Sequence, residues 1–598
     1  MLHSLRTTLN RIFRRRASVV QAPDTHADAE RRMVYTLAKS RLPTFRQLRY
    51  LPTVASSTER LLLLTLSGFV IVSLLFLGAR AYARNVTLLP RSGGGIVEAI
   101  VGTPQYLNPI LVSTNDVDRD LVAFLYAGLF KRNGAQKIEP DLAESYEVST
   151  DNKVYTVHLR KGLAWSDGTP LTSDDVLLTF ELIQDSLYKS PLRGQFKNMK
   201  VERLDETSVR FTLTQPTSAF FSSLTVGILP AHIWGDVPPP SFALIEYNIK
   251  PIGAGPYQFE SLKRDASTGA IKEYHLVRNK QYHGSCPYLN EYTFKIFMDT
   301  ESALQALRSK KVDSISVVTA EQRAEAKQVR LIDLQIPQYT ALFINTKRPV
   351  LKTIEVRNAL ATAVDRNDLV SSILRGSALV VDGPIPPNMP GYAGPLQPGF
   401  NVDEANRILE NAGWKRTDSG NVRKKGNDEL AFSLSVSDVP EDLVIAEKLK
   451  AAWEKVGAKV EIKSFDTSRI AKEIIKPRSY DVFLYGEILS VDADLYPFWH
   501  SSQERDPGLN LTNFYNKDAD KLLEELRTAV DPAVIAEKRI AFQKLLAKDL
   551  PAIFLYSPLY TYGLSKRVKG FDVAFVTNPS DRFADISKWY VKTKIAFK

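Results

Sequence analysis

The chain is poor in the residues and motifs that mark several protein classes. Cys286 is the single cysteine among 598 residues, which excludes an intramolecular disulfide. The sequence has no Gly-x-x-x-x-Gly-Lys-Ser/Thr loop, Gly-x-Gly-x-x-Gly turn or Gly-x-Ser-x-Gly elbow, the motifs of many nucleotide-binding proteins and hydrolases. His275, His283 and Cys286 match no zinc-ligand spacing, so surface positions on a strand and loop are favoured over a metal site. We therefore expect no metal, no cofactor and no enzymatic activity.

Excess positive charge is missing from most of the chain. Residues 1–84 hold 14 of the 78 basic residues and 4 of the 67 acidic ones. Residues 85–598 therefore hold 64 bases and 63 acids, and the net charge of +11 comes mainly from the first part. A nearly neutral domain argues against nucleic acid as a partner. The basic first part is either a topology signal alone or a contact for anionic lipid headgroups.

One long hydrophobic run is present, LLLLTLSGFVIVSLLFLGA at residues 61–79. As a helix it would span ~28 Å, close to the ~30 Å hydrocarbon core of a bilayer. The basic residues of 1–60 predict a cytoplasmic tail, one transmembrane helix at 61–83 and a large domain on the extracytoplasmic face of the cell membrane. A cleaved signal peptide is the alternative, because Ala81-Tyr82-Ala83 fits a cleavage site, but the run is long for a signal core and starts late.

The remaining sequence is typical of an α/β protein. Glycines in residues 84–94 predict a flexible junction after the membrane helix. Alternating patterns at 153–159 and 208–213 predict strands. Ser173 is the expected N-cap of a helix, and apolar periodicity predicts further helices at 403–412 and 443–456, each followed by glycine. The length beyond the membrane helix favours about two or three lobes.

Residues 138–176, IEPDLAESYEVSTDNKVYTVHLRKGLAWSDGTPLTSDDV, carry a family resemblance. The segment resembles the signature of the family-5 extracellular solute-binding proteins, which include oligopeptide- and dipeptide-binding subunits of ABC importers. Further stretches that look like the family follow in order, among them Leu107-Asn108-Pro109, Gly253-Ala254-Gly255-Pro256-Tyr257, Val356-Arg357-Asn358-Ala359-Leu360 and Phe498-Trp499-His500-Ser501-Ser502. The resemblance covers roughly residues 95–598.

The resemblance implies the type II periplasmic-binding-protein fold, in which two α/β lobes close over a solute and an extra third lobe packs on one of them. Closure would be a hinge motion at the strands that cross between the lobes. The expected divisions are lobe I at 95–138, 252–343 and 554–598, lobe II at 139–251, and lobe III at 344–553.

The resemblance also implies a function and a site. The clamp would bind a peptide or another small solute and deliver it, as a monomer, to the permease subunits of an ABC importer. The expected solute-binding residues are Thr114, Asn115, Tyr485, Glu487, Ile488, Ser490, Asp492, Asp494, Trp499 and His500. Peptide-binding relatives pair with the ligand backbone by strand addition and grip its α-amino group with an acidic residue. That acidic position corresponds here to Leu489 or Ser490, so the remaining candidates for the grip are Glu487, Asp492 and Asp494.

Several of these assignments have alternatives. Asp492 and Asp494 would equally cap a helix before Leu495. Trp499 either lines the cleft or packs between lobes, and His500 has no assignable orienting acid, which favours a binding or packing role over catalysis. The alternatives for the whole protein are a solute sensor coupled to signalling and a binder of a non-peptide solute such as a metal chelate, an oligosaccharide or haem.

Overall fold

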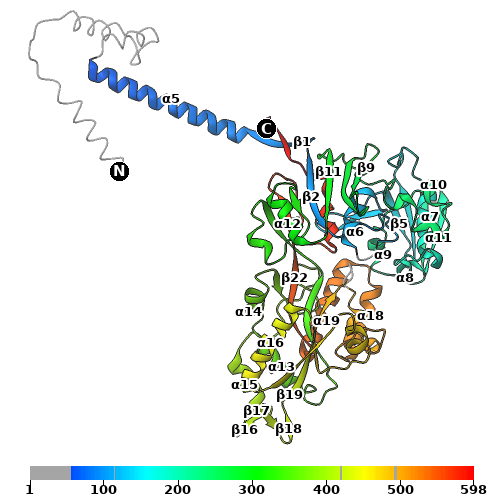
Figure 1. Cartoon of the computed structure of the whole chain (residues 1–598), viewed down its shortest axis with the longest axis vertical. Helices are drawn as coiled ribbons and strands as arrows, with labels where there is room; N and C mark the ends of the chain where they lie inside the picture. Colours follow the sequence, from blue (N-terminus) through cyan, green and yellow to red (C-terminus); the bar gives the residue numbers. More distant parts are fainter. Residues whose placement is uncertain (1–55, 113–114, 418–419, 490–493, 598) are drawn as a thin grey trace, which may run out of the picture. The chain divides into compact units, whose positions relative to one another are not determined.

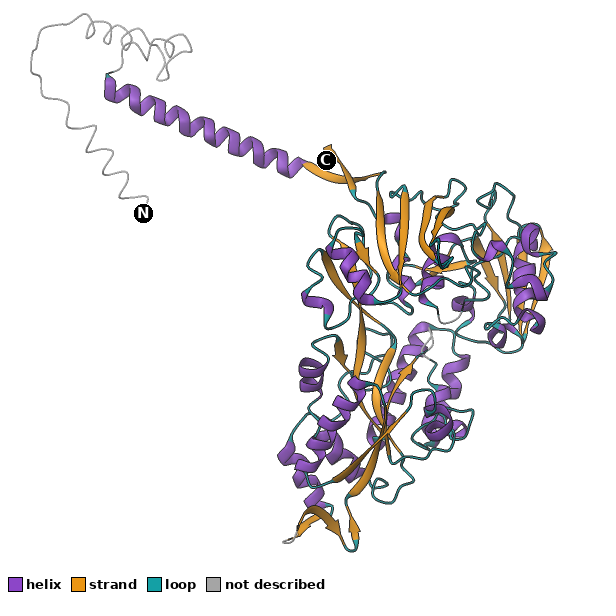
Figure 2. Ribbon diagram, in the orientation of Figure 1, coloured by secondary structure: helices purple, strands orange, loops and turns teal. Residues whose placement is uncertain are grey.

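The computed structural model divides the chain into two compact units, one of residues 1–89 with 594–598 and one of residues 90–593. Figure 1 labels the elements along the sequence, and Figure 2 distinguishes helices from strands. The structure describes residues 56–112, 115–417, 420–489 and 494–597.

Among its described residues, the first unit contains one long helix, α5 (Ser57–Asn85). The backbone N–H of Ser56 donates to the Glu59 carboxylate at 2.9 Å, an arrangement that starts a helix. The stretch Leu64–Tyr82 has a mean hydropathy of 1.9, is unburied, and is long and apolar enough to cross a membrane. The span predicted at 61–83 thus lies within α5.

Strand pairing follows α5 directly. Strand β1 (Val86–Arg91) pairs with β23 (Lys592–Phe597). Beyond β1, the backbone N–H of Gly93 donates to the carbonyl of Tyr288 at 2.7 Å. Residues 84–94, where the sequence predicts a flexible junction, thus include strand β1.

A mixed sheet runs through the second unit in the order β20-β19-β21-β14-β22-β12-β2-β11-β10-β9, and β13 and β15 also pair with β22. Its strands are β2 (Gly95–Val101), β9 (Tyr257–Arg264), β10 (Ile271–Arg278), β11 (Glu291–Phe297), β12 (Ser314–Ile315), β13 (Val329–Gln335), β14 (Gln338–Ile344), β15 (Ala378–Val380), β19 (Ala431–Ser437), β20 (Lys459–Phe465), β21 (Val482–Ile488) and β22 (Ala552–Ser565). Strand β2 is parallel to β11 and β12, and β19 is parallel to β20 and β21. This partly parallel sheet confirms the predicted α/β class.

Strand β22 belongs to both halves of this sheet. Its first residues pair with β14, as in Phe343 opposite Ala552, and its last residues pair with β12 and β13, as in Leu331 opposite Gly563. Strands β13 and β14 are separated only by residues 336–337, so they make a second crossing segment. The lobe divisions expected after residues 343 and 553 therefore fall inside continuous strands. Sheet partners change instead near residues 337 and 558, which local sequence patterns do not reveal.

A smaller antiparallel sheet, β5-β6-β8-β7, follows the first strands of the second unit. It comprises β5 (Ala143–Val148), β6 (Val154–Leu159), β7 (Met199–Asp205) and β8 (Ser208–Leu213), after the short pair β3 (Phe130–Arg132) and β4 (Ile138–Pro140). The predicted strands at 153–159 and 208–213 are confirmed. Helix α7 (Ser173–Gln184) is capped by Thr172, whose hydroxyl accepts from the Asp174 N–H at 3.3 Å, and not by Ser173. The Ser173 hydroxyl donates instead to the carbonyl of Asp205.

The other elements are mostly helices. They are α6 (Asp116–Leu125), α8 (Arg193–Phe196), α9 (Phe220–Ser223), α10 (Ala231–Trp234), α11 (Pro239–Phe242), α12 (Thr300–Arg308), α13 (Ile354–Thr362), α14 (Arg366–Asp368), α15 (Val402–Asn411), α16 (Pro440–Lys455), α17 (Tyr496–Trp499), α18 (Lys517–Thr528), α19 (Pro532–Asp549), and the strands β16 (Lys415–Thr417), β17 (Gly420–Lys425) and β18 (Asp428–Glu429). Helices α15 and α16 confirm the predictions at 403–412 and 443–456. Gly413 and Gly457 follow them with φ of 85° and 90°, a conformation that glycine adopts without steric cost.

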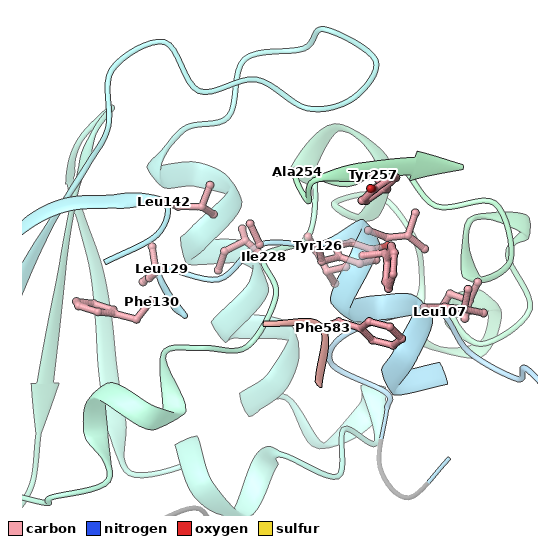
Figure 3. Close-up of a cluster of buried hydrophobic side chains, with 14 of the residues drawn as sticks. Leu107, Tyr126, Leu129, Phe130, Leu142, Ile228, Ala254, Tyr257 and Phe583 are labelled. Atoms are coloured by element: carbon pink, nitrogen blue, oxygen red, sulfur yellow. The ribbon is translucent and has the colours of Figure 1, made fainter. Parts of the chain in front are cut away.

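One hydrophobic core gathers side chains from distant parts of the sequence. Figure 3 shows Leu107 and Tyr126 near Tyr257 and Phe583 in this cluster. The same cluster continues into the smaller sheet through Phe130 and neighbouring residues. The chain therefore returns to this core after long excursions, as a discontinuous lobe requires.

The excursion between β14 and β22 has two cores of its own, one on each face of its half-sheet. Because side chains of a strand alternate between faces, Leu342 and Ile344 belong to one core, while Ala341 and Phe343 belong to the other. The first core includes Trp453 of α16, and the second includes residues of α17, α18 and α19.

Candidate functional site

Most of the predicted site residues lie on β21 and in the segment that follows it. Phe483, Tyr485 and Glu487 alternate along β21 and therefore share one face of the sheet. Tyr485 stacks on Phe483 with ring centroids 4.9 Å apart and is half-buried, whereas Ile488 is 67% exposed. Antiparallel pairing with β14 places Tyr339 directly opposite Glu487.

Glu487 is a buried carboxyl group with few partners. Its side chain is only 4% exposed, and the Tyr339 hydroxyl donates to one carboxyl oxygen, Oε2. The other oxygen, Oε1, has no hydrogen-bond partner among the described residues. Burial raises the pKa of Glu487 to about 8, and the Tyr339 hydrogen bond opposes this only in part. The carboxyl group is therefore mostly protonated at neutral pH.

Trp499 packs in the same hydrophobic core as Tyr339. It is fully buried at the end of α17, with ring centroids 6.3 Å from Phe343 and 5.8 Å from Phe554. The described ring contacts of Trp499 are packing contacts within one hydrophobic core.

Asp494 lies at the start of α17. Its Oδ1 accepts from the backbone N–H of Tyr496 at 3.0 Å, and its Oδ2 lies 3.7 Å from Arg527 Nε. Asp494 thus accepts from the first residue of α17, but the N-cap of this helix is Leu495, which makes no side-chain capping bond. Ser490 and Asp492, which were also predicted here, lie outside the described residues.

His500 occupies a turn after α17. It is 7% exposed, stacks on Tyr496 at 4.1 Å, and its Nδ1 lies 2.8 Å from the Ser502 hydroxyl. The backbone N–H of Ser502 also meets Nδ1 at 3.1 Å, so the imidazole caps this turn. Its Nε2 lies 3.5 Å from the Glu524 carboxylate. These contacts come from α17, the turn that follows it and α18, and Nε2 has no hydrogen-bond partner among the described residues.

Asn115 lies on a different element, as the N-cap of α6. Its side-chain oxygen accepts from the N–H groups of Val117 at 3.0 Å and Asp118 at 3.4 Å, and its amide donates to the Thr103 carbonyl at 2.8 Å. Both ends of the amide thus stabilise local structure. Thr114, predicted beside it, lies outside the described residues.

The residues considered for a metal site have other partners. His275 Nδ1 lies 2.8 Å from the Thr293 hydroxyl, and His283 Nε2 lies 2.9 Å from Asp141. Cys286 is exposed. Within the described ranges, no group of three or more His, Cys, Asp or Glu residues is arranged to hold a metal ion. A hollow of about 520 Å³ lies against α7, β7 and β8, but none of the predicted site residues lines it.

The structure thus brings Tyr485, Glu487 and Trp499 to the same core, while Asn115 belongs to a separate part of the fold. Sequence reasoning missed Tyr339, the partner of Glu487 at a separation of 148 residues. A strand can be predicted at 338–344 from its apolar composition, but its register with β21 has no local signal. Together with Tyr339, Glu487 offers a buried carboxyl group that can lose its proton and then bind a positively charged group.

Comparisons with known proteins agree with this fold. The model of the bacterial extracellular solute-binding proteins, family 5 Middle, matches residues 137–506, more than half of the chain. The oligopeptide-binding protein AppA of Bacillus subtilis (strain 168) is 29% identical over 517 residues, which cover 84% of this chain and 92% of that protein.

Solved structures extend the similarity to three dimensions. The B. subtilis AppA structure in complex with a nonapeptide has a TM-score of 0.61 at 28% identity, covering 84% of this chain and 100% of that one. The ABC transporter substrate-binding protein CtaP of Listeria monocytogenes has a TM-score of 0.70 at 27% identity, with 84% and 100% covered. The periplasmic binding protein AgaA from A. tumefaciens R10, in complex with agropinic acid, has a TM-score of 0.58 at 26% identity, with 84% and 99% covered.

The family of these proteins binds solutes, which agrees at a general level with the prediction that the chain is not an enzyme. Because the family model covers most of the second unit, the chain belongs to the bacterial extracellular solute-binding proteins of family 5.

Proposed function

We propose that this protein captures peptides or similar small solutes outside the cytoplasm and delivers them to an ABC importer. The observation that carries the proposal is membership of family 5, in which a relative covered over most of its length, AppA, is an oligopeptide-binding protein. The AppA structure holds a nonapeptide, a ligand chemistry that suits strand addition.

Capture would occur by closure of two lobes. The segments β13–β14 and β22 support this, since both cross between the two halves of the main sheet and are suited to act as hinges. Lobes I and II would share the core in Figure 3, lobe II would also hold the smaller sheet, and lobe III would be the segment between β14 and β22. The divisions between lobes I and III would then lie near residues 337 and 558.

Glu487 is the carboxylate that we propose for the ligand's amino group. It combines burial with an oxygen that lacks a partner among the described residues, whereas Asp494 already serves α17. A ligand ammonium would supply the missing counter-charge and favour the ionised form of the carboxyl group. Glu487 is only 4% exposed, so a solute would reach it only after the residues that bury it move aside.

The domain would be held at the membrane by α5, with residues 1–60 in the cytoplasm. The unburied apolar stretch Leu64–Tyr82 and the basic residues before it support this topology. Full-length protein should then remain in the membrane pellet after carbonate extraction. Amino-terminal sequencing of the mature protein that begins at Arg84 would instead show a cleaved signal peptide.

A non-peptide solute is the second candidate, because AgaA is similar at 26% identity and was solved with agropinic acid. Native mass spectrometry of the full-length protein, released from detergent with its co-purified ligand, distinguishes the two. A family of masses that fragment as peptides is expected. A single non-peptide mass would overturn the peptide assignment, and absence of any bound solute together with no binding of added peptides would overturn solute capture.

A further inference from the structure

The ribbon formed by β1 and β23 is tied to the end of α5. The Thr87 hydroxyl donates to the Ala596 carbonyl at 3.4 Å, and the rings of Tyr82 and Phe597 meet edge to face at 6.0 Å. The last turn of the apolar helix and strand β23 therefore form one structural element, although more than 500 residues separate them in sequence.

This ribbon leaves large apolar side chains uncovered. Phe597 is 71% exposed, Ile595 is 58% exposed and Leu88 is 63% exposed. Phe597 and Ile595 are two residues apart on β23 and share a face, so Lys592 and Lys594 share the opposite face. The strand is thus amphipathic, with an apolar side that the described chain leaves mostly exposed.

The charge of the surrounding sequence has a single sign. Residues 80–95 and 589–598 together contain six basic residues and no acidic residue. The bases on described residues are Arg80, Arg84, Arg91, Lys592 and Lys594. Such a surface is complementary to phosphate groups.

The length of α5 places the ribbon near the surface of a bilayer. The uncharged run ends at Ala79, and the helix continues for six residues to Asn85, or ~9 Å. Headgroups add ~5–8 Å on each side of the ~30 Å hydrocarbon core. Strand β1 therefore begins at about the outer edge of the headgroup layer, without any intervening linker.

We propose that the β1–β23 ribbon is a membrane-contact element. Its apolar side, with Phe597 and Ile595, rests in the headgroup layer, and its basic side chains lie level with the lipid phosphates. Continuity with α5 and the single sign of charge select lipid as the occupant over a second protein. The inference rests on the proposed membrane span.

The test uses single nitroxide labels on the full-length chain in vesicles of phosphatidylcholine and phosphatidylglycerol. The exposed Cys286 is first replaced by Cys286→Ser, and labels are placed through Ile595→Cys, Phe597→Cys and Lys594→Cys. Leu244→Cys is the matched control, because Leu244 is an 83% exposed apolar residue remote from α5 in sequence. Accessibility to oxygen, which concentrates in hydrocarbon, is compared with accessibility to a water-soluble nickel chelate.

Labels at 595 and 597 should show an oxygen-to-chelate ratio several-fold above that at 244, while the label at 594 should resemble the control. Equal ratios at 597 and 244 would overturn the inference, as would shielding of 595 and 597 from both reagents, which indicates a protein partner. Protein that fails to sediment with the vesicles after carbonate treatment would overturn the membrane span as well. A failure confined to the ribbon is therefore distinguishable from a failure of the anchor.

Discussion

Glu98 and Glu487 are both buried glutamates, but the charges around them differ. Glu98 lies on β2 and accepts from Arg582 Nη2 at 3.0 Å and from the Tyr562 hydroxyl at 2.7 Å. The same guanidinium group donates from Nη1 to Asp120 at 2.7 Å. Glu487 meets only the Tyr339 hydroxyl, with no basic side chain beside it among the described residues.

The difference separates a structural cluster from a candidate binding group. A buried charge is stable only with a counter-charge and hydrogen bonds, and the Glu98 cluster contains its own cation. Burial still raises the pKa of Asp120 to about 6, although Arg582 opposes the rise, and the nearby Glu98 carboxylate adds to it. No basic side chain among the described residues pairs with Glu487, so its carboxyl group stays protonated until a cation binds beside it. In our proposal the solute supplies that cation.

The largest effect is expected from removing the cation of the structural cluster. Arg582→Met would leave Glu98 and Asp120 buried without a partner, which should lower the free energy of unfolding by roughly 3–5 kcal/mol. Denaturant unfolding measures this loss. The matched control is Arg308→Met, since Arg308 forms a half-exposed pair with Glu325 that is worth about 1 kcal/mol or less. Equal losses in both variants would contradict the assigned role of Arg582.

The next effect concerns the pH dependence of stability. A carboxyl group whose pKa rises on folding binds its proton more tightly in the folded state, so it favours folding at low pH. For Glu487 this contribution is lost as pH rises from about 4.5 to about 8. Glu487→Gln cannot ionise and should therefore equal the parent at pH 5 but exceed its stability by roughly 2–4 kcal/mol at pH 8.

Melting temperatures at the two pH values test this prediction. Glu301→Gln is the control, because Glu301 is an exposed residue in the first turn of α12. Glu301→Gln should change the melting temperature of the parent by the same amount at both pH values. A Glu487→Gln variant that parallels the parent from pH 5 to pH 8 would show that the carboxyl group already has a counter-charge.

The smallest effect is expected at Asp494. Asp494→Ala removes the acceptor for the Tyr496 N–H and should cost about 1 kcal/mol, whereas Asp494→Asn keeps an acceptor oxygen and should cost a few tenths. Thermal unfolding compares the two variants. Because the carboxylate serves the helix, peptide affinity should stay unchanged in both. Loss of peptide affinity in Asp494→Asn would instead assign the ligand contact to Asp494.

The sequence predicted local elements well and distant pairings poorly. The strands at 154–159 and 208–213 and the helices before Gly413 and Gly457 follow from alternation, periodicity and left-handed glycines, which are local properties. The change of partner along β22 has no local signal, because it occurs inside one continuous strand. The glycines after α5 suggested a free linker, but a strand from the far end of the sequence orders that segment.

The candidate site residues were selected from the family resemblance, which contains no information on contacts between distant residues. The resemblance selected Glu487 and Trp499 together with residues such as Asn115, which the structure uses for capping. Burial of Glu487 depends on Tyr339, and the pairing of Glu98 depends on Arg582, 484 residues away. Sequence spacing alone carries no information on such contacts.

Calorimetry of peptide binding tests the central claim most directly. The full-length parent and its Glu487→Gln variant are titrated with one co-purified peptide in two forms, with a free and with an acetylated amino terminus. Glu487→Gln should weaken binding of the free-amine peptide by roughly 2–5 kcal/mol and leave the acetylated peptide unaffected. If the parent, Glu487→Gln, Asp492→Asn and Asp494→Asn all bind both forms alike, no carboxylate of this segment meets the amino group and the proposed role of Glu487 is wrong.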